Sequence, residues 1–378
     1  MKVYKKAILP LGFKVNAVSC GIKRSGKLDL ALLYSDLPAQ AAAGFTTNKI
    51  QAAPIKLSQR YLRANKNFQA IIVNSGNANA FTGNLGLKDA AETAKITAKF
   101  LRLKKSSVLV NSTGIIGRRL PLLKIKKAIP LLVKGLSVSG MKRVQKAIMT
   151  TDTSSKGITV KFNLGAKTIT ICGIAKGAGM IAPNLATMLV FILTDAHIAQ
   201  GVLAKALSLC LEDSFNCITV DGCMSTNDSV ILLANGLAAN VLIKGGKNFN
   251  KFSRALGIVC LELAKLVVQD AEGATKFIRI KIRGAKNFKD ARKTALAIAN
   301  SLLFKTAIYG ENPNFGRIVC AIGASGIAVR EERLKIKVSP LSRKEIDVEI
   351  ALGMGSAEAT IYTSDLTPEY IKINAEYN

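Results

Sequence analysis

The order of apolar and polar positions along the 378-residue chain predicts strands and helices that alternate over most of its length. Continuous apolar runs at 69–73 and 107–110 are typical of buried strands, and each ends in a polar turn that contains glycine. Residues 158–163 and 168–172 alternate around a glycine turn, which predicts a hairpin. Strict alternation of apolar and basic positions over 277–283 predicts a strand with one buried face.

Helical spacing of apolar positions marks five longer segments. They are residues 88–103, 120–136, 202–212, 249–270 and 288–303. We expect a break or a kink in the second at Pro130, because proline lacks the N–H that a helix interior uses. Further strands are predicted at 334–338, 347–352 and 360–363, and a short helix is predicted after Asp365. This succession predicts an α/β or α+β fold with sheet inside and helices outside.

Composition excludes several classes of protein. The chain is 49% apolar, which argues against disorder, and its seven Cys residues include no C-x-x-C pair, so we assign them to core packing. The only His is His197, which excludes a multi-His metal site and is more in keeping with a structural role. No run reaches the roughly 18 apolar residues of a membrane span, and no leader pattern precedes the first strand. We therefore expect a cytoplasmic protein with no metal and no membrane partner.

The charge is strongly basic and unevenly distributed. The chain has 54 Lys and Arg against 24 Asp and Glu, and residues 1–186 carry a net +26 whereas residues 187–378 carry +4. No acidic residue occurs from Thr93 to Thr151. Such a stretch is compatible with a basic nucleic-acid-binding protein, but it lacks interleaved aromatic residues and any known binding motif. We prefer a solvated, lysine-rich surface and expect no nucleic-acid partner.

The candidate chemistry lies in the segment Lys176-Gly-Ala-Gly-Met-Ile-Ala-Pro-Asn-Leu-Ala-Thr187. A glycine turn leads directly into an apolar strand that begins at about Thr187, which places a hydroxyl at the mouth of a buried strand. A Thr hydroxyl needs a base. Its own α-amino group, with a pKa of about 7.7–8.0, can serve once the bond after Ala186 is cut. From the residues alone, a structural Thr at the start of a strand is the commoner interpretation.

This segment closely resembles the self-cleavage signature of the ornithine acetyltransferase (glutamate N-acetyltransferase) family of arginine biosynthesis, and the similarity runs nearly from end to end. Further matching blocks follow one another in the family's order. They are residues 12–14, 21–26, 45–48, 73–80, 112–117, 149–153, 225–228, 270–276, 310–314 and 373–377. The resemblance implies an α-β-β-α sandwich like that of N-terminal-nucleophile enzymes, with a smaller C-terminal α/β lobe.

The resemblance also implies an activity. The chain would cut itself between Ala186 and Thr187, giving an α chain of residues 1–186 and a β chain of residues 187–378. Thr187 would then take an acetyl group from N2-acetyl-L-ornithine and pass it to L-glutamate in ping-pong order. Thr113 and Gly114 match the family's oxyanion-hole pair. The matches to its substrate-binding positions are Thr153, Lys176, Thr187, Glu272 and Asn374.

The types of the matching residues suit these substrates. Lys176 or a hydroxyl can hold the α-carboxylate that N-acetylornithine and glutamate share, and Glu272 can pair with the ornithine ammonium. The resemblance implies an α2β2 assembly of the two fragments and no cofactor. It leaves open whether acetyl-CoA serves as a second acetyl donor.

The sequence departs from the family's residue pattern at some positions, and one alternative enzyme class remains open. Phe81 and Phe315 stand where the family commonly has Cys and Trp, and a Ser or Thr usual after Asn374 has no counterpart before the last residue given, Asn378. A self-processing amidohydrolase or aminopeptidase would use the same kind of nucleophile but give the acyl group to water. The match at Glu272, together with that at Lys176, favours the acetyltransferase.

Overall fold

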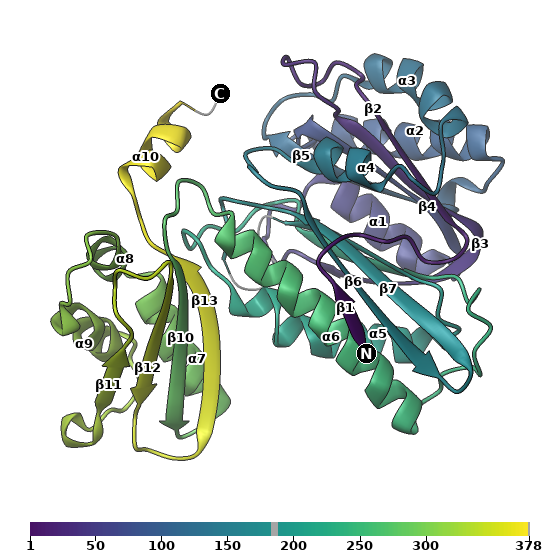
Figure 1. Ribbon diagram of the computed structural model, residues 1–378. Helices are drawn as coiled ribbons and strands as arrows, with labels where there is room; N and C mark the ends of the chain where they lie inside the picture. The colour runs from purple at the N-terminus through teal and green to yellow at the C-terminus, as the bar shows by residue number, and fades with distance from the viewer. Residues whose placement is uncertain (183–187, 377–378) are drawn as a thin grey trace. The chain divides into compact units, whose positions relative to one another are not determined.

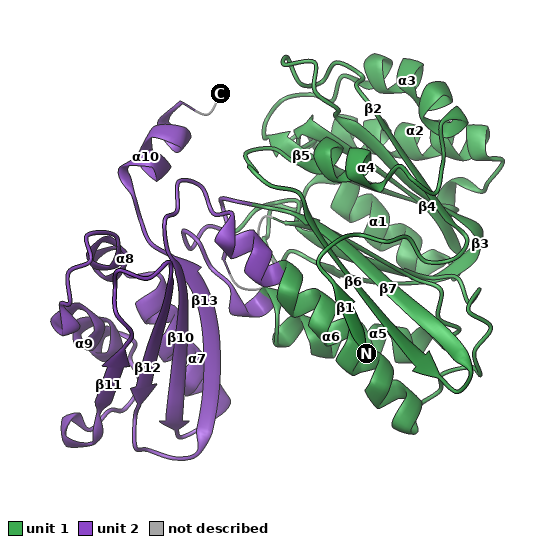
Figure 2. Cartoon of the chain, in the orientation of Figure 1, with its two compact units in different colours: residues 1–177, 184–215, 224–263 green, residues 178–183, 216–223, 264–378 purple. Residues whose placement is uncertain are grey.

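The computed structural model describes residues 1–182 and 188–376, and the chain divides into two compact units (Figure 2). Unit 1 comprises residues 1–177, 184–215 and 224–263. Unit 2 comprises residues 178–183, 216–223 and 264–378. The fragments 1–186 and 187–378 divide the chain differently, because unit 2 includes residues from both of them. The cut itself stays a prediction.

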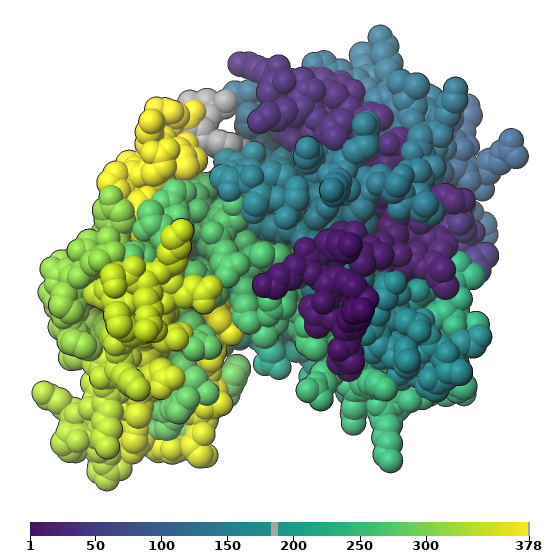
Figure 3. Space-filling view, viewed as in Figure 1, coloured from purple at the N-terminus to yellow at the C-terminus, as the bar shows by residue number. Residues whose placement is uncertain are grey.

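Unit 1 contains a nine-stranded mixed sheet (Figure 1). Its strands are β1 Lys2–Tyr4, β2 Phe13–Val18, β3 Leu30–Phe45, β4 Phe68–Asn77, β5 Val108–Ile115, β6 Lys156–Leu164, β7 Lys167–Lys176, β8 Leu189–Thr194 and β9 Ser229–Ala234. Their order is β1-β6-β7-β8-β9-β3-β4-β5, with β2 paired to β3. The long strand β3 joins two halves, because its residues 30–34 pair with β2 and β4 whereas residues 40–45 pair with β9. Strand β1 pairs with β6, and the N-terminal residues lie on the surface beside it (Figure 3).

Helices cover both halves of this sheet. They are α1 Ala53–Ala64, α2 Gly83–Leu101, α3 Leu122–Lys134, α4 Met141–Ile148, α5 Gln200–Glu212 and α6 Gly246–Gln269, with short 3-10 turns η1 Lys105–Ser107 and η2 Phe215–Cys217. Helices α1–α4 pack on β2–β5, and α5 packs on β3. On β7, Gly173 makes room for α6, since a Cβ there would come 2.7 Å from the side chains of Val259 and Leu263. The flanking Cys172 and Ile174 point into the core shared with β2–β5. This layering confirms the predicted α-β-β-α order.

Unit 2 is the smaller α/β lobe that the sequence predicts. Its elements are β10 Phe277–Ala285, β11 Lys335–Val338, β12 Glu345–Ala351, β13 Ala357–Ser364, α7 Phe288–Ala299, α8 Leu302–Tyr309, α9 Phe315–Ala324, α10 Pro368–Ala375 and the turn η3 Glu331–Arg333. The strands lie in the order β11-β12-β10-β13. The alternation over 277–283 is confirmed, because the isoleucines of β10 are buried in one core with α7. The basic positions between them face outward, where Arg279 pairs with Asp347 at 2.7 Å.

Most predicted elements are confirmed with shifted ends, and a few expectations are wrong. Residues 288–303 do not form one helix, because the Ser301 side chain accepts the Phe304 N–H at 3.3 Å and starts α8. Helix α3 continues through Pro130, so that a break there is wrong, whereas the alternative of a kink stays a prediction. Core packing is wrong for Cys223 and Cys320, which are exposed. None of the helices within residues 1–182 and 188–376 has the length and apolar character to cross a membrane.

Candidate active site

The oxyanion pair proposed from the sequence lies at the carboxyl ends of two neighbouring parallel strands. Strands β4 and β5 run in register, so that Ser75 lies beside Thr113 and Gly76 lies beside Gly114. Gly114 has a φ of 129°, and a Cβ there would come 2.4 Å from the carbonyl carbon of Gly76. Only glycine fits this position, and it leaves the backbone accessible to a ligand. The carboxyl ends of parallel strands are where α/β folds commonly place their ligands.

Lys176 reaches this pair from the end of β7. The residue is 3% exposed, and its Nζ donates to Thr113 Oγ1 in a long contact of 3.5 Å. Two predicted site residues that are 63 positions apart are therefore neighbours in unit 1. A buried ammonium beside a hydroxyl and a glycine N–H suits the stabilisation of negative charge that develops on an acyl oxygen.

A buried carboxylate, Asp152, binds the backbone of the residue that follows Lys176. Its Oδ1 accepts from Lys156 Nζ at 2.7 Å and from the Gly177 N–H at 2.7 Å. Burial opposes ionisation, but the charges of Lys176 and Lys156 outweigh it and lower the pKa of Asp152 to about 2. Asp152 is therefore a carboxylate at any pH at which the protein would work.

A third lysine, Lys23, belongs to the same group of charges. Its Nζ donates to the carbonyls of Leu28 at 2.9 Å and Met149 at 2.8 Å. Burial lowers the pKa of Lys23 to about 8, an effect that Asp29 opposes and Lys176 reinforces. Sequence reasoning did not single out Lys23, Asp152 or Lys156. The first two lie within matching blocks, at 21–26 and 149–153, and this was the only signal that pointed to them.

The sequence also predicts site residues at Thr153, Ala186 and Thr187. Thr153, next to Asp152 in the chain, is exposed. Ala186 and Thr187, the residues of the predicted cut, lie outside the described residues.

Met188, the second residue after the predicted cut, is held by the matching block 225–228. The Met188 N–H donates to Asp228 Oδ1 at 2.7 Å. Asn227 Nδ2 donates to the Ser112 carbonyl at 2.8 Å, next to the oxyanion pair. This block therefore ties the start of β8 to the carboxyl end of β5, a role that the sequence alone did not reveal.

In unit 2, the structure brings Glu272 and Asn374 together across 102 positions of sequence. Asn374 Nδ2 donates to Glu272 Oε2 at 2.8 Å. The Glu272 N–H donates to the Ala178 carbonyl at 2.9 Å, and the Glu272 carboxylate covers Gly179. A partly exposed carboxylate fixed in this way can accept an ammonium group.

Asp221 anchors the same glycine loop and was not among the predicted residues. Its Oδ2 accepts the Met180 N–H at 2.6 Å and its Oδ1 accepts the Ile181 N–H at 2.9 Å. The Tyr370 hydroxyl donates to Asp221 Oδ2 at 3.1 Å, and burial together with this carboxylate raises the pKa of Tyr370. The loop that precedes the predicted cut is thus held by a side chain about 40 residues away along the chain.

These features define the class of protein. The chain is an α/β enzyme whose larger unit places a hydroxyl and a glycine with a positive φ at the carboxyl ends of two parallel strands, beside a buried lysine. It belongs to the ArgJ family, whose model matches residues 14–342 and 339–378. The resemblance seen in the motifs is therefore confirmed.

Individual relatives extend over the whole chain. The Arginine biosynthesis bifunctional protein ArgJ of Geobacter sulfurreducens is 44% identical over 388 residues, which cover 97% of this chain and 98% of the relative. A mitochondrial ArgJ of Lodderomyces elongisporus is 40% identical over 417 residues, covering 99% and 95% of the two chains. Among solved structures, a chain of the Mycobacterium tuberculosis ornithine acetyltransferase complexed with ornithine is 38% identical. It covers 48% of this chain and 97% of its own length, with a TM-score of 0.45.

Proposed function

We propose that the chain is a self-cleaving glutamate N-acetyltransferase of arginine biosynthesis. It moves the acetyl group of N2-acetyl-L-ornithine to L-glutamate and yields L-ornithine and N-acetyl-L-glutamate. Family membership over the whole chain supports the reaction class. The observation that carries the proposal is the contact of 3.5 Å between Lys176 Nζ and Thr113 Oγ1 beside Gly114.

Self-cleavage comes first in this proposal. The Thr187 hydroxyl attacks the Ala186 carbonyl, the C–N bond breaks, and the Thr187 nitrogen leaves as a free amine. Water then opens the ester, which releases an α chain of residues 1–186 and a β chain of residues 187–378. The backbone contacts of Asp221 to Met180 and Ile181 support this step, because they restrain the loop that leads to the bond.

Acetyl transfer uses the new N-terminus. The neutral α-amine of Thr187 takes the hydroxyl proton, the oxygen attacks the acetyl carbonyl of N-acetylornithine, and ornithine leaves with that proton. Glutamate then attacks the acetyl ester through its neutral α-amine, the bond between the acetyl carbon and the Thr187 oxygen breaks, and the amine proton passes through the Thr187 α-amine to that oxygen, which restores the hydroxyl. Thr113 Oγ1 and the Gly114 N–H receive the developing oxyanion, and one such donor is worth about 3–4 kcal/mol of barrier.

The two substrates are distinguished by charge. Lys176, with Thr153, takes the α-carboxylate that both substrates carry. Glu272 takes the ornithine ammonium, and Asn374 holds the Glu272 carboxylate in place through its bond of 2.8 Å. We further propose an α2β2 assembly in the cytoplasm and no resident cofactor, with acetyl-CoA to be assayed as a second donor.

The purified chain tests the proposal directly. On a denaturing gel with intact-mass analysis, we expect two fragments, the first ending at Ala186, whereas Thr187→Ala should remain one chain. With N-acetylornithine and glutamate, we expect N-acetylglutamate in amounts equal to the ornithine released. Release of acetate instead would identify an amidohydrolase. An intact and active wild-type chain would rule out the proposed nucleophile.

A further inference from the structure

Unit 1 contains two buried charged residues, Asp152 and Lys156, that the proposed reaction does not yet use. The side chains of Asp152 and Lys156 are both 0% exposed and form an ion pair of 2.7 Å. Lys176 is 3% exposed, and its charge acts on the same carboxylate. Two buried lysines therefore act on this one carboxylate, and Lys176 is the one that contacts Thr113.

Asp152 also fixes the backbone on both sides of the site. Its Oδ1 accepts the Gly177 N–H at 2.7 Å, where Gly177 has a φ of 151°. Its Oδ2 accepts the Thr150 N–H at 3.0 Å. One carboxylate thus joins the segment 150–156 to the end of β7, at the residue that follows Lys176.

We infer that Asp152 is a positioning residue for acetyl transfer, which holds the Lys176 ammonium charged beside Thr113, and that Lys156 competes with Lys176 for the same carboxylate. This inference rests on the proposed function, because that function gives Lys176 its task beside Thr113, where its charge takes the α-carboxylate that both substrates carry. Asp152 touches neither substrate in this scheme and acts through Lys176 and Gly177.

The physical reason is the cost of burying charge. An ammonium group removed from water prefers its neutral form unless a carboxylate lies near it. Among the described residues, the charged groups that act on Asp152 or Lys176 include Lys156 and Lys23, and Asp29 and Lys27 act in turn on Lys23. Lys23 is an example of a lysine whose burial outweighs the attraction of a carboxylate, because burial lowers its pKa to about 8 although Asp29 opposes the change.

Two substitutions should therefore move the alkaline limb of the kcat/KM profile in opposite directions. In Asp152→Asn the amide oxygen can still accept the Gly177 N–H but carries no charge, so Lys176 should lose its proton at a lower pH. We expect the midpoint of the alkaline limb to move to lower pH by about one unit or more. In Lys156→Met the carboxylate is left to Lys176, and the limb should move to higher pH. The double variant should lie between them.

Asp195→Asn is the matched control. Asp195 is a buried aspartate at the opposite end of β7, where it accepts the Thr170 N–H at 2.8 Å and the Leu11 N–H at 3.3 Å. Its replacement removes a buried carboxylate that accepts backbone N–H groups, and the groups that shift its pKa include no lysine. We expect an unshifted alkaline limb, whatever the change in thermal stability. A limb near pH 8 in the kcat/KM profile can also come from Lys23, and Lys23→Met should remove such a limb. In the Lys23→Met background, Asp152→Asn and Lys156→Met should still move the remaining alkaline limb in opposite directions.

The outcomes separate the inference from the function on which it rests. A wild-type chain that transfers acetyl, with Asp152→Asn and Lys156→Met limbs unmoved or moved in the same direction, would overturn the inference alone. A wild-type chain that neither cuts itself nor transfers acetyl would overturn the proposed function. If Asp152→Asn does not fold, judged by its thermal melt, the upward shift in Lys156→Met decides the question, and its absence counts against the inference.

Discussion

The Glu272 carboxylate lies against the backbone of Gly179, so closely that a Cβ at position 179 would come 2.2 Å from Glu272 Oε2. The atoms in the way form the end of a flexible side chain, so that a methyl group would displace the carboxylate and leave the backbone in place. We expect Gly179→Ala to keep its melting temperature and to raise the KM for N-acetylornithine roughly tenfold. Gly201→Ala, at a helical site with open space around it, should change neither value. A Gly179→Ala variant with wild-type kinetics would argue against a substrate role for Glu272.

The charge of Glu272 should matter to one substrate more than to the other. We expect Glu272→Gln to raise the KM for N-acetylornithine by roughly tenfold or more and to affect glutamate less, because only ornithine has a side-chain ammonium. The measurement is a two-substrate initial-rate series. Glu358→Gln, an exposed partner of Lys281 on another part of unit 2, is the control. Equal effects on both substrates would contradict ammonium pairing.

Asp221 should control the rate of self-cleavage. Its two oxygens hold the N–H groups of Met180 and Ile181. Asp221→Ala removes both acceptors and should slow the appearance of fragments by about tenfold or more. Asp221→Asn keeps one acceptor oxygen and should be intermediate. The time course of fragment formation on a gel, with fully cut wild type as reference, shows whether this order holds.

Acid should remove stability that Asp152 contributes. Its pKa is lowered in the folded protein from 3.8 to about 2, so its contribution is fully present above pH ~5 and is lost as pH falls towards 2. The size of the contribution is about 2 kcal/mol. Urea unfolding of the wild type between pH 5 and pH 2.5 should show this loss, and Asp152→Asn should lack that part of the pH dependence. Identical pH dependence in both proteins would contradict the assignment.

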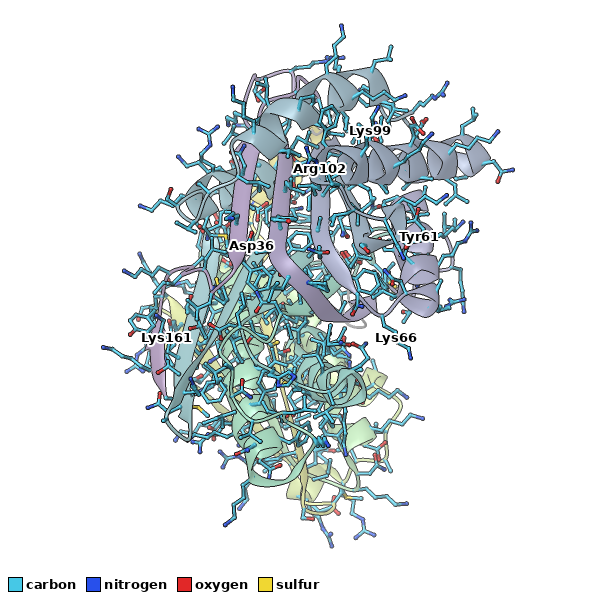
Figure 4. The ribbon with its side chains drawn as sticks, turned by 90° about the vertical axis from the view of Figure 1, so that its right-hand side faces the viewer. Asp36, Tyr61, Lys66, Lys99, Arg102 and Lys161 are labelled. Atoms are coloured by element: carbon cyan, nitrogen blue, oxygen red, sulfur yellow. The ribbon has the colours of Figure 1, made fainter. Side chains whose placement is uncertain are left out.

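The basic surface should not bind nucleic acid strongly. Figure 4 shows basic side chains extending outward around unit 1, with Lys66 and Lys161 labelled, and they come from several separate elements. A dispersed surface without stacking aromatic residues gives only salt-sensitive attraction. We expect no RNA binding in a filter assay near physiological salt. Binding that survives there would revive the nucleic-acid alternative.

Local patterns allowed much of the fold to be predicted. The alternation over 277–283 became β10 with its isoleucines buried, and the hairpin around Gly165 became β6 and β7. These succeeded because periodicity depends only on which face of an element is apolar. The division of 288–303 into α7 and α8 was missed, because Ser301 acts as a cap only when its side chain turns to the Phe304 N–H.

The sequence by itself determined the family, the order of the elements and the identity of the matching site residues, since each of these is written in short stretches of the chain. Only the tertiary structure decided that Lys176 lies against Thr113, that Asn374 lies against Glu272, and that Asp152 forms a buried ion pair with Lys156. The physical reason is that strand register and helix packing set which distant side chains meet. Burial then sets the strength of the electrostatic interactions between these side chains. A local sequence pattern encodes neither which side chains meet nor how deeply they are buried.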